Sequence, residues 1–177
     1  MKKKTLALVL ALTLLVAGVV GGTLAWLTDR TAEVKNTFTV GDINIGLTET
    51  TADYKMVPGN TIAKDPTVTV KANSEACWLF VKVTESTDLK DFITYAIAEG
   101  WTALPGVDGV YYREVPASAA DQTFSVLAGN TVTVNTTVTK TMLETAKTDA
   151  PTLTFQAYAI QEDHFTTADA AWAEVSK

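Results

Sequence analysis

The sequence has 177 residues, enough for one domain of ordinary size with a hydrophobic core, and its formal charge is −6. This acidic balance argues against a nucleic-acid-binding protein, which needs clustered lysine and arginine side chains against the phosphates. The single cysteine, Cys77, excludes an intrachain disulfide and therefore a disulfide-rich scaffold.

The first 25 residues have the three parts of a secretory signal peptide. Lys2, Lys3 and Lys4 form a positive region, the stretch 6–20 is apolar, and Ala25 supplies a small residue at a cleavage site before Trp26. Cleavage there would leave 11 basic against 20 acidic side chains, because three of the 14 basic residues and no acidic residue are removed. The mature charge would be −9, which suits a protein outside the cell.

An uncleaved membrane anchor is the alternative interpretation of the same segment. No charged residue occurs in the 23 residues from Thr5 to Leu27, which is long enough to cross a bilayer. Trp26 would then lie at the membrane interface, where tryptophan is common. The residues alone leave both interpretations open.

Residues 26–36 form a weak strand by themselves. Trp26, Ala32 and Val34 fall on one alternating face, and Leu27 and Lys35 fall on the other, which is mostly polar. Such a segment gains little from its own side chains, but it can pair if another sheet offers an open edge. We therefore treat residues 26–36 as a candidate donor strand.

The rest of the chain predicts an all-β domain, residues 37–177, with short peripheral helices. Valine, isoleucine and phenylalanine alternate with threonine in segments separated by turn residues, and a one-residue slip at Gly41 predicts a β-bulge. The expected strands are 38–47, 68–72, 77–81, 95–98, 110–115, 124–126, 131–140 and 153–160, and the expected helices are 88–93, 141–147 and 166–175. About eight short strands favour a two-sheet β-sandwich, in particular a jelly roll.

Two stretches carry a resemblance to a known family. They are "GGTLAWLTDRTAEVKNTFTVGDINIGL" from Gly21 to Leu47 and "MVPGNTIAKDPTVTVKANSEACWLFVKV" from Met56 to Val83. Both resemble the TasA/camelysin family of Gram-positive surface and biofilm-matrix proteins, and the pieces "GWTAL", "VYYREV" and "AYAIQ" are similar to its clostridial, BsaA-like branch. The resemblance covers most of the chain and is looser between Ser86 and Ala150.

The resemblance implies a jelly roll behind an N-terminal signal helix, residues 1–25, that a SipW-type signal peptidase cleaves between Ala25 and Trp26. It implies a secreted protein at the cell surface or in the matrix, in contact with the membrane only before cleavage. It also implies head-to-tail homopolymerisation into extracellular fibres by donor-strand exchange, together with accessory matrix proteins. Ala32 and Val34 would then face the neighbouring core, with Trp26 or Leu27 as an end anchor, and Lys35 is a candidate for a covalent bond to an asparagine or aspartate of that neighbour.

The residues predict no enzyme and no cofactor. Camelysins have been described as metalloproteases, but this chain has one histidine, His164, and no H-E-x-x-H motif, whereas a catalytic zinc needs about three ligands. Cys77 lies in an apolar segment beside Trp78, where a cysteine is usually an inert small hydrophobe rather than a nucleophile paired with His164.

A monomeric adhesin or carbohydrate-binding module is the alternative to a fibre subunit. Tyr111, Tyr112, Trp78 and Trp101 are aromatic side chains of the kind that line sugar-binding grooves, although core packing is the commoner use of such residues. A secreted metalloprotease is a third and weaker hypothesis. The sequence therefore predicts a matrix fibre subunit first and a monomeric surface module second.

Overall fold

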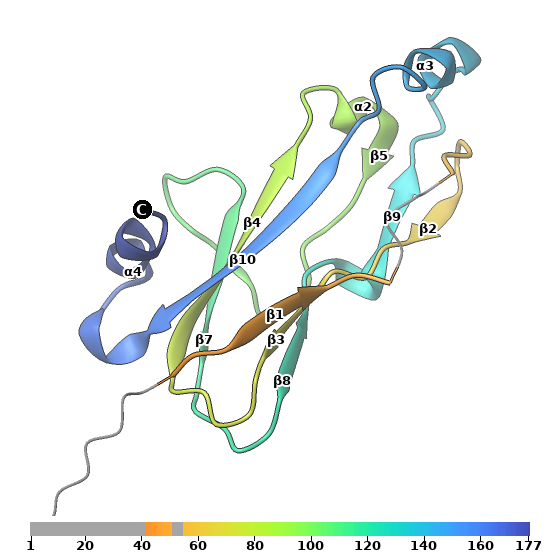
Figure 1. Cartoon of the computed structure of the whole chain (residues 1–177). Helices are drawn as coiled ribbons and strands as arrows, with labels where there is room; N and C mark the ends of the chain where they lie inside the picture. The colour runs from red at the N-terminus through yellow and green to blue at the C-terminus, as the bar shows by residue number, and fades with distance from the viewer. Residues whose placement is uncertain (1–41, 51–54) are drawn as a thin grey trace, which may run out of the picture. The chain divides into compact units, whose positions relative to one another are not determined.

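The computed structural model describes residues 42–50 and 55–177, which form ten strands and a few short helices (Figure 1). The strands are β1 (Ile45–Thr48), β2 (Thr61–Ala63), β3 (Thr67–Val70), β4 (Cys77–Glu85), β5 (Ile93–Thr94), β6 (Thr102–Ala103), β7 (Val110–Val115), β8 (Gln122–Ser125), β9 (Thr131–Val134) and β10 (Leu153–Gln161). The helices are α2 (Leu89–Phe92), α3 (Lys140–Thr145) and α4 (Ala168–Val175), with 3-10 turns η1 (Ala128–Asn130) and η2 (Glu162–His164). The prediction of an all-β domain with short helices is confirmed.

The strands form three antiparallel sheets where the sequence predicted two. Their orders are β1-β3-β8, β10-β4-β7-β6 and β2-β9-β5. The third sheet arises because two neighbouring segments of the chain are each interrupted between two strands. Pro66 lies between β2 and β3, and Gly129, with φ of 62°, lies between β8 and β9. The backbone bonds from Val126 N to Pro66 O (2.9 Å) and from Lys64 N to Asn130 O (2.8 Å) join the chain across this break.

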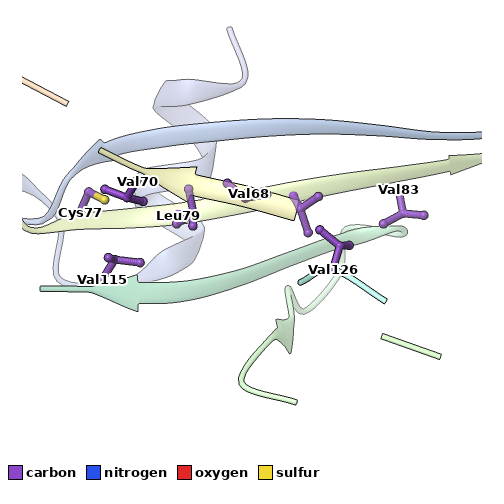
Figure 2. Packing of buried hydrophobic residues seen from close by; sticks show 8 residues of the cluster. Val68, Val70, Cys77, Leu79, Val83, Val115 and Val126 are labelled. Carbon is purple, nitrogen blue, oxygen red and sulfur yellow. The ribbon is translucent and has the colours of Figure 1, made fainter. Parts of the chain in front are cut away.

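The main core lies between the first and second sheets. Every second residue of β3 and β4 points into it, because successive side chains of a strand alternate between the two faces. Its buried members are Val68, Val70, Cys77, Leu79, Val81, Val83, Val115 and Val126. Figure 2 shows these side chains gathered between the ribbons of β3, β4 and β7.

On the other face of β4, Trp78 and Phe80 are also buried, because α4 covers this half of the strand, while Lys82 and Thr84 beyond it are exposed. Phe80 packs against Trp172 with ring centroids 5.3 Å apart, and Trp172 meets Tyr158 of β10 edge-on at 5.1 Å. The Thr167 hydroxyl caps this helix by accepting a hydrogen bond from Ala170 N. The strand expected at 77–81 is therefore present, and all five of these residues are buried.

Several local predictions were wrong in type or extent. The segment 95–98 makes a single bridge, from Ile97 to Leu127, and not a strand. The alternating segment after Thr131 ends at Val134, because Thr139 caps α3 by accepting a hydrogen bond from Met142 N. The short strands β2, β5 and β6 were not predicted. Gly59, with φ of 81°, lies in a turn closed by Asn60 N to Val57 O at 3.0 Å.

The predictions that concern the first 41 residues lie outside the described part of the chain. These are the signal segment 1–25, the donor segment 26–36, the boundary at residue 37 and the first half of the 38–47 strand. They stay predictions.

We expect Leu79→Ala to lower the free energy of unfolding by about 3–5 kcal/mol, because the side chain is fully buried in the main core and its loss leaves a cavity. Urea denaturation followed by tryptophan fluorescence measures this. Leu47→Ala is the matched control, since Leu47 is 37% exposed, and it should cost less than about 1 kcal/mol. Equal losses would contradict the assignment of the core.

Candidate functional site

Two edge strands of different sheets lie next to each other. β10 bonds β4 along all nine of its residues, from Leu153 opposite Glu85 to Gln161 opposite Cys77, while β1 bonds β3. Within residues 42–50 and 55–177, no other strand is bonded to β10 or to β1. The two edges contact each other across the open side of the sandwich, where Figure 1 shows β1 beside β10.

A row of hollows follows these edges, and we call it the β1–β10 groove. At one end a hollow of about 380 Å³ is lined by Ile43, Ala159, Ile160, Gln161, His164, Phe165 and Glu174. Towards the other end a hollow of about 300 Å³ is lined by Leu47, Thr48, Glu49, Pro66, Leu153, Thr154 and Phe155. A third, of about 430 Å³, continues past Leu153 between β10 and the β2-β9-β5 sheet. The hollows thus border both ends of β10, at residues 153–155 and 159–161.

The wall of the groove on β10 is apolar and incompletely covered. Leu153, Phe155, Ala157 and Ala159 alternate on the face that meets the main core, and each is only half-buried. The opposite face of β10 changes character along the strand, with Tyr158 and Ile160 under α4 and the exposed Thr154 and Gln156 beyond it. An apolar sheet edge with free backbone groups is the kind of surface that accepts another strand.

A largely buried ion pair lies where two of the hollows meet. Lys64 Nζ is 2.7 Å from Glu49 Oε1 and 5.4 Å from the ring centre of Phe155. Lys64 is 7% exposed, so its charge depends on this carboxylate, because an unpaired buried ammonium is costly. The pair joins the end of β1 to the segment after β2 and so fixes the groove at this point.

The sequence candidates for chemistry have ordinary structural roles. Cys77 is fully buried in β4, and burial raises the pKa of its thiol to about 11, with a smaller contribution from the charge of Glu162. His164 lies in η2 and lines the groove at its Gln161 end. Among the described residues no group of three or more His, Cys, Asp or Glu side chains is placed to hold a metal ion.

The aromatic candidates for a sugar-binding groove are used in packing. Trp78 is buried and donates its indole N–H to Phe165 O at 3.1 Å, and Tyr112 lies against it with ring centroids 5.8 Å apart. Trp101 donates to Ser125 O at 2.9 Å. Tyr111 packs against the main core. None of these four rings lines the β1–β10 groove.

Arg113 of β7 is held between aromatic rings on the far side of the sheet from α4. Its guanidinium lies 3.9 Å from the ring centre of Phe124 and 5.4 Å from that of Trp101. Burial lowers the pKa of this side chain, and the flat stacking explains how it is accommodated beside β8. This contact ties the first sheet to the second at the end of the core opposite β10 and β1.

A polar concavity of about 420 Å³ lies near the start of β7, away from the groove. Lys82, Glu85, Tyr95, Asp108 and Tyr111 are among its lining residues. The Tyr95 hydroxyl donates to the Glu85 carboxylate, and burial together with this carboxylate raises the pKa of Tyr95. Tyr95 and Tyr111 also pack against the main core and are partly buried.

No family model, curated protein or solved structure matches this chain. Within the described residues, none of the helices has the length and apolar character needed to cross a bilayer.

The sequence predicted a donor segment and gave no indication of the β1–β10 groove. Trp26, Leu27, Ala32, Val34 and Lys35, like the cleavage site at Ala25, lie outside the described residues. The β1–β10 groove joins residues 43–49 to residues 153–161, more than 100 positions apart. The only local signal for its acceptor wall is the alternation of β10, which does not say that the strand lies at an edge.

We expect the Cys77 thiol to react with a soluble aromatic disulfide at pH 8 at least about a hundredfold more slowly in the folded protein than in urea, because reaction needs an exposed thiolate. Since the folded pKa exceeds the reference value of 9.0, the neutral thiol favours folding fully below pH 9, and this contribution is lost as the pH rises through about 11. Leu47→Cys in a Cys77→Ala chain is the exposed control and should react quickly when folded. Fast labelling of native Cys77 would contradict its burial.

Proposed function

We propose that this protein is a secreted subunit of an extracellular matrix fibre, which polymerises by placing its mature N-terminal segment, residues 26–36, on a sheet edge of the next copy. The observation that carries this proposal is the β1–β10 groove, an apolar sheet edge nine residues long with no bonded neighbour among the described residues. Its length is close to that of the 11-residue segment. The resemblance to the TasA/camelysin family supports the same proposal.

Backbone pairing explains why a weak strand is sufficient as the donor. An incoming strand satisfies N–H and C=O groups of the acceptor edge, and side chains at alternate positions fill the space behind it. Because the donor segment and the acceptor edge are different surfaces of one chain, the contact is heterologous. A heterologous contact that does not close into a ring propagates as a filament.

Export would then control assembly. Signal cleavage between Ala25 and Trp26 by a SipW-type peptidase releases the donor segment from the membrane, so that polymerisation follows secretion. The proposed fold is a jelly roll, supported by the face-to-face packing of the first two antiparallel sheets around one core. No catalytic or cofactor role is part of the proposal, and Lys35 is the proposed donor of any covalent link between subunits.

We expect Val34→Asp to abolish fibres and leave the monomer folded, because a carboxylate would be carried into the apolar wall of the acceptor. Negative-stain microscopy and circular dichroism of a protein spanning residues 26–177 measure the two effects. Thr31→Asp is the matched control, since threonine has nearly the shape of valine and position 31 falls on the opposite face of the segment. Fibres that survive Val34→Asp would contradict the assignment of the donor face.

A second protein that starts at Thr37 separates the two leading hypotheses. Filaments from residues 26–177 and only folded monomers from residues 37–177 are the expected result. Folded monomers from both proteins would contradict the fibre hypothesis and favour a monomeric adhesin or carbohydrate-binding module. Bound zinc with chelator-sensitive proteolysis would instead favour the camelysin-type protease.

A further inference from the structure

We infer that the donor segment lies in the β1–β10 groove antiparallel to β10, with Val34 opposite Leu153 and Trp26 opposite Gln161. This inference rests on the proposed function and adds to it the acceptor edge, the strand direction and the register. Nothing in the sequence of the donor segment decides among the sheet edges of the acceptor.

The choice of acceptor edge follows from two features, the length of each edge strand and how far its apolar side chains are covered. The other edge strands of the described residues are short: β6 and β5 have two residues each, β2 has three, and β1 and β8 have four each. β10 has nine residues, more than twice as many as any other edge, and its inward residues Leu153, Phe155 and Ala159 line two of the hollows. A donor of 11 residues therefore finds matching backbone groups only there.

The direction follows from where the chain leaves its own domain. The described chain begins at Asp42, and Ile43 lies in the same hollow as Gln161, so the first described residues lie at the end of the groove where β10 ends. In a filament whose subunits share one orientation, a segment that leaves at this end meets the opposite end of the next subunit, beside Leu153. From there the donor segment continues along the groove to its free N-terminus beside Gln161. The donor segment therefore runs antiparallel to β10.

The antiparallel register also matches side-chain sizes on the inward face. It sets the small residues Val34 and Ala32 opposite Leu153 and Phe155, the large residues of β10. At the next two pairs the larger side chain belongs to the donor segment and the smaller one to β10. Arg30 and Thr28 lie opposite Ala157 and Ala159, where small side chains leave room for the arginine stem and its charged group can reach solvent at the sandwich edge.

The two ends and the outward face agree with the same register. Trp26 reaches the 380 Å³ hollow formed in part by Ile43 and Phe165, as an end anchor should. On the outward face Leu27 lies opposite the apolar Ile160, and Glu33 lies opposite the exposed Thr154. Between them Asp29 lies opposite Tyr158, whose ring packs against α4 but carries a polar hydroxyl. A parallel strand of equal overlap would exchange these two partners, so that a glutamate would meet Ile160 under α4.

Paired cysteines distinguish the two directions. In a Cys77→Ala chain spanning residues 26–177, one variant carries Glu33→Cys with Thr154→Cys and a second carries Leu27→Cys with Ile160→Cys. Directly opposite residues have Cβ atoms about 4.5–5.5 Å apart, which is near the range that a disulfide spans. After oxidation, both variants should give a ladder of covalent multimers on a non-reducing gel that collapses to monomer on reduction.

The exchanged pairs, Glu33→Cys with Ile160→Cys and Leu27→Cys with Thr154→Cys, are the matched controls and should give no ladder. A ladder from the exchanged pairs alone would overturn the antiparallel direction. Filaments under reducing conditions with no ladder from any pair would overturn the groove as the acceptor, while the fibre function would stand. Crosslinked monomers with no filaments would show that residues 26–36 complete their own domain, and would overturn both the inference and the proposed function.

Discussion

The structure depends on burying both faces of β4. Its odd-numbered residues from Cys77 to Val83 form the main core with the first sheet, while Trp78 and Phe80 face α4. A strand covered on both faces needs neighbours on both edges as well, because its backbone N–H and C=O groups have no access to water. β7 and β10 supply these neighbours, and β10 does so over the full nine residues. β10 therefore pairs with β4 both where β4 is buried on two faces and where its outer face, at Lys82 and Thr84, is exposed.

The groove is a consequence of this arrangement. β10 is as long as β4, but β1, the strand across from it in the first sheet, has only four residues and cannot cover the inward face of β10 at both ends. α4 covers the opposite face of the sheet, where Trp172 packs on Phe80 of β4 and Tyr158 of β10. The inward residues Leu153 to Ala159 are therefore left half-covered. Completing the main core and exposing an apolar edge are two results of the same packing.

The alternation and spacing of apolar residues along the sequence were enough to predict the long strands and the last helix. The strands β4, β7 and β10 follow from alternation and apolar runs, and α4 follows from its threonine cap and helical spacing. The segment 95–98 has the same kind of alternation but becomes a single bridge, because Tyr95 is drawn to Glu85 and only Ile97 meets Leu127. The third sheet was missed because its cause is tertiary: Pro66 and Gly129 break two paths that lie side by side only after folding. The groove was missed for the same reason.

The proposed donor strand explains why the acceptor edge must be apolar as well as open. A backbone hydrogen bond contributes about 0.5–1.5 kcal/mol net, whereas ordering one residue costs about 1–2 kcal/mol. Pairing alone therefore gains nearly nothing for a segment as polar as residues 26–36. The balance has to come from the few apolar side chains that the segment carries, which are Trp26, Leu27, Ala32 and Val34. These stabilise the contact only where the acceptor leaves apolar surface exposed to water. Half-covered residues such as Leu153 and Phe155 present that surface, and the same exposure is a liability for a free monomer, since it favours any strand that reaches it. Under the proposed function, a subunit built in this way would exist only briefly alone and would persist in a filament.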